Sequence, residues 1–109
     1  MMDHRVQHVV SYIRKNYQRK VTLSEMAAGV NLSRWGLCHL FKQHMGTSPE
    51  RFLTQVRLEK AKHLLESGFL SVKEVMRKVG ISDPGFFNRS FKAAYGCTPG
   101  KYRGESRKS

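Results

Sequence analysis

Two histidines near the start of the chain, His4 and His8, have the i, i+4 spacing of metal ligands on one face of a helix. A zinc site needs further ligands, and the only nearby carboxylate or thiolate is that of Asp3. We therefore expect no metal site and no cofactor. The chain also lacks a nucleophile elbow, a glycine-rich phosphate loop and paired carboxylates on one helix face, so we do not expect an enzyme.

Side chains that attract polyanions are far more frequent. The 109 residues include 20 Lys and Arg against 8 Asp and Glu, which gives a formal net charge of +12. This balance is typical of proteins that bind nucleic acid or an anionic membrane surface. Hydrophobic residues make up 39% of the chain, so it should fold as one domain or as two small subdomains that share a core element.

The sequence favours a cytoplasmic, nucleoid-associated protein. No apolar run approaches the ~18 residues of a membrane span, and "MMDHRVQHVV" lacks the long apolar stretch of a signal peptide. A peripheral membrane binder would need a helix with an exposed apolar face and a basic rim, whereas the apolar stripes here are needed for two cores. Cys38 and Cys97 are far apart without CxxC spacing, which favours two reduced thiols over a disulfide.

One pattern occurs twice along the chain, as "LFKQHMGTSPERF" in residues 40–52 and as "SFKAAYGCTPGKY" in residues 90–102. Each copy is preceded by a capping box, "TLSE" from Thr22 and "SVKE" from Ser71, which marks the start of a helix.

A tight turn and a second cap follow each of these helix starts. Asn31 and Gly80 tolerate the left-handed backbone of a tight turn, and a second helix start follows at Ser33 and at Asp83 with Pro84. The sequence therefore predicts a helix-turn-helix made twice.

The remaining segments complete an all-α fold of about seven helices, in which a long central helix joins two helix-turn-helix subdomains. Residues 1–20 carry one apolar stripe of Val6, Val9, Val10, Ile13 and Tyr17. We expect subdomains over residues 1–48 and 68–103, a linker helix over 49–67, and a disordered basic tail over 104–109. Nineteen helical residues make a rod of roughly 28 Å, which with its flanking turns approaches the ~34 Å between major-groove openings on one side of DNA.

The second helix of each copy has an inward and an outward face. Helical spacing predicts that the inward face carries Leu37, Leu40, Phe41, His44 and Met45 in the first copy and Phe87, Phe91, Ala94 and Tyr95 in the second. The outward positions correspond one to one: Trp35 with Gly85, Cys38 with Asn88, His39 with Arg89, and Lys42 with Lys92.

The outward side chains suit contact with a DNA groove. Arg89 could pair bidentately with guanine and Asn88 with adenine, and Lys42 and Lys92 would neutralise phosphates. The helix starts at Thr47, Ser48, Thr98 and Pro99 could offer backbone N–H groups to phosphates or be ordinary caps.

Several of these side chains have alternative roles. The Trp35 indole either folds back onto the core or offers apolar contact in a groove. His39 is either a DNA contact or plain surface, and Cys38 is a packing residue rather than a redox switch. Arg57 lies near the apolar side of the linker helix, where we expect an internal partner rather than DNA.

These features together resemble the DNA-binding domain of the AraC/XylS family of bacterial transcription regulators. The resemblance covers residues 5 to about 103 and is most specific in "VMRKVGISDPGFFNRSFKAAYGCTPGKYR", residues 75–103. "SRWGLCHLFK" is similar to the small stand-alone activators of that family. The resemblance implies a monomer that lays two helices into adjacent major-groove segments of double-stranded DNA and contacts RNA polymerase to activate transcription. It places Arg34, Trp35, Cys38 and His39, and Pro84, Gly85, Asn88 and Arg89, at the DNA.

The chain departs from the family pattern at four positions, two of which are Cys38 and His39, where relatives often have polar or basic residues. Met76 stands where members usually have Ala, and Gly85 has no side chain with which to read a base. A nonspecific or architectural nucleic-acid-binding protein with the same fold is the alternative function. The chain is either a complete stand-alone regulator or the DNA-binding part of a longer one.

Overall fold

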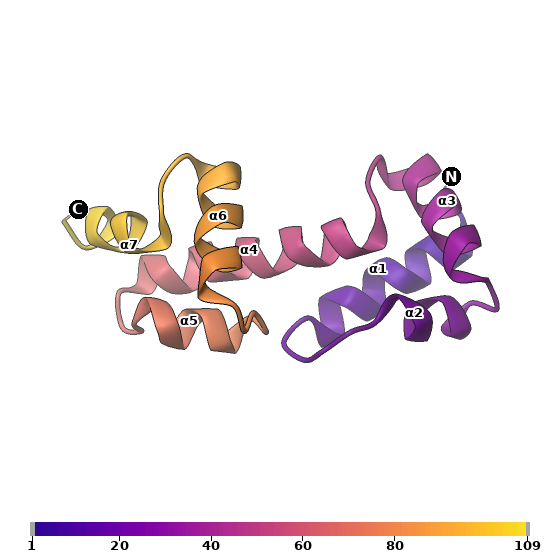
Figure 1. Ribbon diagram of the computed structural model, residues 1–109, viewed down its shortest axis with the longest axis horizontal. Helices are drawn as coiled ribbons and strands as arrows, with labels where there is room; N and C mark the ends of the chain where they lie inside the picture. Colours follow the sequence, from indigo (N-terminus) through magenta and orange to yellow (C-terminus); the bar gives the residue numbers. More distant parts are fainter. Residues whose placement is uncertain (1, 109) are drawn as a thin grey trace. The chain divides into compact units, whose positions relative to one another are not determined.

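The protein is folded into helices and short connections in the computed structural model, which describes the backbone of residues 2–108 and the side chains of residues 2–105. Seven helices lie within these residues (Figure 1): α1 (His4–Asn16), α2 (Leu23–Gly29), α3 (Arg34–Met45), α4 (Pro49–Ser67), α5 (Val72–Lys78), α6 (Pro84–Tyr95) and α7 (Pro99–Lys108). The predicted all-α class and the long central helix α4 are confirmed.

Contacts divide the chain into two compact units, Met1–Val56 and Arg57–Ser109, with the boundary inside α4. The segment predicted as a linker helix, residues 49–67, is α4. Each half of α4 supplies side chains to one unit, because the buried apolar residues of its first half are Phe52, Leu53 and Val56 and those of its second half are Leu58, Ala61 and Leu65.

The core of the first unit is built from one face of each of its helices. The stripe predicted for α1 is largely confirmed, with Val10 and Tyr17 at its partly buried edge. The buried set is Val6, Val9, Ile13, Met26, Ala27, Leu37, Phe41, Phe52, Leu53 and Val56. The rings of Phe41 and Phe52 meet edge to face with centroids 5.7 Å apart, which joins α3 to α4.

The second unit repeats this arrangement. Phe87 and Phe91 on α6 contact each other edge to face at 6.0 Å, and the ring of Tyr102 on α7 packs against Phe91 at 5.6 Å. Met76 is buried, so the larger side chain at this position is accommodated in the core.

Two predicted inward positions are exposed in the structure. His44 is exposed in the last turn of α3, where a polar imidazole keeps its water and lies near the negative end of the helix dipole. Ala94 is exposed because Tyr95 covers the inward side of the last turn of α6, with its ring centroid 4.8 Å from that of Phe91.

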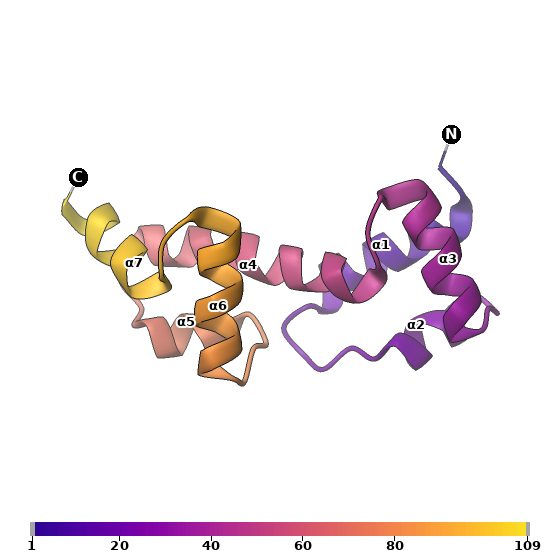
Figure 2. The same ribbon diagram turned by 45° about the horizontal axis from the view of Figure 1, so that its top comes forward.

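The two helix-turn-helix motifs are α2 with α3 and α5 with α6 (Figure 2). Matching hydrogen bonds build both of them. Both predicted capping boxes are present, and Asn31 and Gly80 have positive φ angles of 57° and 84°. Two residues after α2, the N–H of Asn31 donates to the Ala28 carbonyl at 3.2 Å, and after α5 the N–H of Gly80 donates to the Arg77 carbonyl at 3.1 Å. The sequence repeat is therefore also a repeat of backbone geometry.

The C-terminal helix α7 extends further than expected. It runs to Lys108, so residues 104–108 of the predicted disordered tail are helical, and Ser109 lies outside the described residues. Its first turns are anchored to the second unit by Arg103, whose Nε donates to the Leu70 carbonyl at 2.6 Å and whose Nη2 donates to the Gly68 carbonyl at 3.3 Å. The hydroxyl of Tyr102 also donates to Glu66.

Candidate nucleic-acid interface

The outward face of α3 is the first of two candidate recognition surfaces. Ser33 caps the helix, because its hydroxyl accepts the N–H of Gly36 at 3.0 Å. The inward face is pinned to the core by Leu37 and Phe41. This orientation leaves four predicted DNA-contacting residues exposed and Cys38 half-buried at the flank; the exposed four are Arg34, Trp35, His39 and Lys42.

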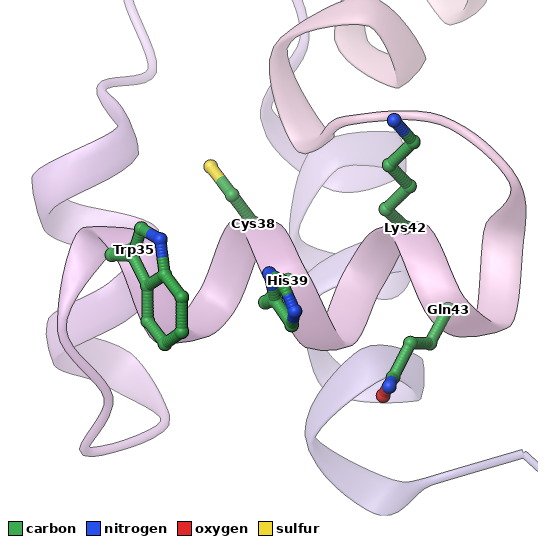
Figure 3. A pocket seen from close by; sticks show the side chains of 5 residues that line it. All are labelled: Trp35, Cys38, His39, Lys42 and Gln43. Carbon is green, nitrogen blue, oxygen red and sulfur yellow. The ribbon is translucent and has the colours of Figure 1, made fainter.

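Trp35 does not fold back onto the core. Its side chain is 73% exposed, and its indole stacks on the imidazole of His39 with ring centroids 4.6 Å apart and planes inclined by 22°. The two rings project together from α3 (Figure 3). An exposed aromatic pair of this kind offers an apolar surface to the T methyl group in a major groove.

A shallow depression of about 280 Å³ runs along the same face. Four of its lining residues are predicted DNA contacts, namely Trp35, Cys38, His39 and Lys42, and the fifth is Gln43 (Figure 3). Sequence reasoning missed Gln43, whose position one residue after Lys42 on an exposed helix face was the available signal. Its amide could hydrogen-bond a base edge or a phosphate.

The outward face of α6 is the second candidate surface. Asp83 caps this helix through the N–H of Gly85 at 3.0 Å, and Pro84 occupies its first turn as predicted. Phe87 and Phe91 are buried beneath the outward face. Pro84, Asn88, Arg89 and Lys92 are exposed, and Gly85 is half-buried.

The half-buried state of Gly85 has a visible cause. An added Cβ at this position would lie 3.1 Å from Nη1 of Arg89, so the guanidinium of Arg89 lies over the glycine. Arg89 leans toward the start of its helix, as long helical side chains do.

The starts of α4 and α7, the helices that follow the two helix-turn-helix motifs, form a third feature. The hydroxyl of Ser48 accepts the N–H of Arg51 at 3.2 Å, and that of Thr98 accepts the N–H of Lys101 at 3.3 Å, so both hydroxyls act as caps. A depression of about 240 Å³ is lined by Lys42, Gly46, Thr47, Ser48 and Arg51. Two cations and a helix N-terminus converge there, and sequence reasoning missed Arg51 because nothing local marks it.

The two recognition helices themselves carry no carboxylate. α3 and α6 contain no Asp or Glu, and Asp83, next to α6, is engaged as its cap; Glu25 and Glu74 are engaged in the capping boxes of α2 and α5. The hydroxyl of Tyr12 and the guanidinium of Arg19 lower the pKa of Glu25 to about 2, and the backbone N–H of Ser71 lowers the pKa of Glu74. The field at the outward faces is therefore positive.

The remaining features concern metal binding, the two thiols, membrane spans and Arg57. Among the described residues no group of three His, Cys, Asp or Glu side chains could hold a metal ion, and Cys38 and Cys97 are free thiols. No helix in this part of the chain is both long enough and apolar enough to cross a membrane. The guanidinium of Arg57 is half-buried, and burial lowers its pKa, in keeping with an internal role.

Comparison with known proteins matches this geometry to a family. Residues 26–105 match the model of a helix-turn-helix domain. The chain is 35% identical over 98 residues to the lactose operon transcription activator of Staphylococcus xylosus, covering 90% of this chain and 35% of that protein. It is 40% identical over 94 residues to the raffinose operon transcriptional regulatory protein RafR of Pediococcus pentosaceus, covering 86% of this chain and 34% of that protein. The chain thus spans only a minor part of the length of these relatives.

Solved structures of similar fold extend over almost the whole chain. The C-terminal domain of AraT, a response regulator from Geobacillus stearothermophilus, is 33% identical with a TM-score of 0.88, covering 95% of this chain and 87% of that one. The DNA-binding domain of AdpA, solved in complex with a target DNA, is 25% identical with a TM-score of 0.90, covering 97% of this chain and 96% of that one. A probable AraC family transcriptional regulator from Rhodopseudomonas palustris is 28% identical with a TM-score of 0.88 over 95% of this chain. The chain therefore belongs to the AraC family of helix-turn-helix DNA-binding domains of transcription regulators.

Proposed function

We propose that a monomer of this protein recognises a specific double-stranded DNA site by placing α3 and α6 in successive segments of the major groove. The observation that carries the proposal is the matched pair of outward faces, each basic, on a helix without Asp or Glu, and presented by the second helix of a helix-turn-helix. In such motifs the second helix enters the major groove. The 19 residues of α4 supply roughly 28 Å of helix between the two motifs.

Each face has a different means of reading sequence. On α6, Arg89 and Asn88 carry the hydrogen-bonding groups that distinguish guanine and adenine. On α3, the Trp35 and His39 rings supply apolar contact, with Arg34 and Cys38 beside them.

Phosphate contacts fix the register on the duplex. Lys42 and Lys92 serve this purpose at the recognition helices. The backbone N–H groups at Thr47, Ser48 and Thr98 contact phosphates at the starts of α4 and α7. Arg51 adds a positive charge at the depression near Ser48.

The proposed outcome of binding is transcription activation from a site of about two helical turns, through contact with RNA polymerase in the bacterial cytoplasm. The lactose operon relative is an activator by name, and the AdpA domain was solved on its target DNA. Both relationships support the assignment of DNA as the partner.

Selection from a pool of random DNA duplexes tests the proposal. We expect enrichment of an asymmetric motif with two information-rich segments, and binding to it that survives a large excess of bulk DNA. Failure to enrich any motif, with undiminished binding to bulk DNA, would establish the architectural alternative instead.

A further inference from the structure

We infer that Gly85 is a positioning residue for Arg89: the missing side chain at position 85 leaves the space that the guanidinium of Arg89 occupies, and this sets where Arg89 presents its N–H donors. The inference rests on the proposed role of α6 as a recognition helix. It gives a role to the one outward position that cannot itself touch a base through a side chain.

The space above Gly85 is narrow. A Cβ built on its backbone would lie 3.1 Å from Nη1 and 3.9 Å from Cζ of Arg89. The first distance is shorter than an ordinary van der Waals contact, so an Ala at position 85 requires the guanidinium to move by a few tenths of an ångström. Arg89 is four residues further along the helix, where side chains share a face with position 85.

Asp83 borders the same space. Its Oδ1 would lie 3.4 Å from the added Cβ, and it accepts the N–H of Gly85 at 3.0 Å. A guanidinium near a helix N-terminus is disfavoured by the helix dipole, and an adjacent carboxylate offsets that effect. The carboxylate of Asp83 and the guanidinium of Arg89 thus both border the space that a side chain at position 85 would fill.

The equivalent pair in α3 has the same relationship in a different form. Trp35 and Gly85 are the second residues of their helices, and His39 and Arg89 are the sixth. In α3 the second residue supports the sixth by stacking, at 4.6 Å between ring centroids. In α6 the second residue supports the sixth by leaving room. In both helices the second position controls the pose of the sixth.

A double-mutant cycle between Gly85→Ala and Arg89→Ala tests this inference. On the selected DNA site we expect Gly85→Ala to lower affinity about tenfold, a part of what one bidentate contact contributes. The salt dependence should not change, because no charge is removed. In the Arg89→Ala background, Gly85→Ala should have no further effect on affinity.

Gly100→Ala is the matched control for folding. Gly100 also follows a proline at the start of a helix, and a Cβ there meets nothing within 4 Å. Both substitutions replace Gly by the better helix former Ala, so the Tm of each variant should equal or exceed that of the wild type. Gly100→Ala should bind the selected site as the wild type does.

A measurement without DNA examines the pose directly. The ¹⁵N relaxation of Arg89 Nε should report a more mobile guanidinium in Gly85→Ala than in the wild type. Unchanged relaxation would overturn the inference, as would equal losses of affinity from Gly85→Ala in the Arg89 and Arg89→Ala backgrounds. An Arg89→Ala variant with unchanged specificity would instead refute the role of Arg89 in the proposed function.

Discussion

The indole of Trp35 lies stacked on the imidazole of His39, 4.6 Å between ring centroids, on the outward face of α3, where both side chains are exposed. Trp35 is the only tryptophan of the chain and is 73% exposed. A large apolar side chain held in a fixed pose in water contributes little to folding. It is suited to a partner that removes it from water.

The fluorescence of Trp35 should therefore report on DNA binding. We expect its emission to shift to shorter wavelength when the selected site is bound, because the groove excludes water from the indole. Trp35→Ala should weaken specific binding by about 1 to 3 kcal/mol, as loss of one base contact does, while leaving the Tm unchanged.

Phe69→Ala is the control for the Trp35 substitution. Phe69 is 89% exposed in the turn after α4, outside both recognition helices. Its replacement should change neither affinity nor Tm. Emission of Trp35 that stays constant at saturating DNA would mean that α3 does not enter a groove.

Acid should weaken the first unit through Glu25. Its folded-state pKa is lowered to about 2 from 4.5, first by the hydroxyl of Tyr12 and then by Arg19. A depressed carboxyl pKa contributes stability that is present above the unfolded pKa and lost as the pH falls through the folded pKa. We expect the Tm to fall between about pH 4.5 and pH 2, and to fall less steeply in Glu25→Gln.

The Glu25→Gln variant also contains its own internal check. Gln retains an oxygen that can accept from the Thr22 N–H, so the helix start should persist, while an amide NH2 replaces the charged oxygen that accepts from Tyr12 and Arg19. If the wild type and the variant had identical pH dependence of Tm, Tyr12 and Arg19 would not stabilise the ionised carboxylate.

Local chemistry explains how much of the fold could be predicted. The caps at Thr22, Ser33, Ser71 and Asp83 and the left-handed turn at Asn31 depend on side chains and backbone within a few residues, so the sequence pattern contains them. The same is true of the outward faces, because burying one helical stripe exposes the opposite one.

Contacts between distant residues explain what could not be predicted. Arg103 binds carbonyl groups more than 30 residues earlier and helps to keep α7 helical beyond the expected end. Arg51 joins the candidate interface because the start of α4 lies beside Lys42 of α3, rather than through any motif. The pose of Arg89 over Gly85 likewise depends on three-dimensional packing that a helical wheel does not contain.

Binding to DNA should depend strongly on salt. With a net charge of +12 and an estimated 6 to 10 phosphate contacts, affinity should fall on the order of 10³- to 10⁵-fold between 50 and 200 mM salt, because counterions are released from the duplex. Titrations at several salt concentrations measure the slope. A nearly flat response would contradict nucleic-acid binding altogether.

The spacing of the two half-sites should be critical. If α3 and α6 occupy groove segments one turn apart, a footprint should cover about 20 bp as two patches on one face of the duplex. Inserting about 5 bp between the patches moves one of them to the opposite face and should abolish specific binding. Unchanged affinity for the longer site would mean that a single helix-turn-helix engages the DNA.

Arg89→Ala and Lys42→Ala separate sequence reading from charge attraction. Both residues are exposed on outward helix faces, and each substitution removes one positive charge. Arg89→Ala should cost about 1 to 3 kcal/mol on the selected site and relax preference mainly at one base pair, with little added loss on random DNA.

Lys42→Ala should instead weaken binding to selected and random DNA alike and reduce the salt slope by roughly one. Circular dichroism should show both variants folded, because neither side chain belongs to a core. Equal ratios of specific to nonspecific affinity in Arg89→Ala and the wild type would make α6 a backbone clamp. Discrimination between DNA sequences would then come from α3, through Arg34, Trp35 and His39. In that case Trp35→Ala should reduce the ratio of specific to nonspecific affinity more than Arg89→Ala does.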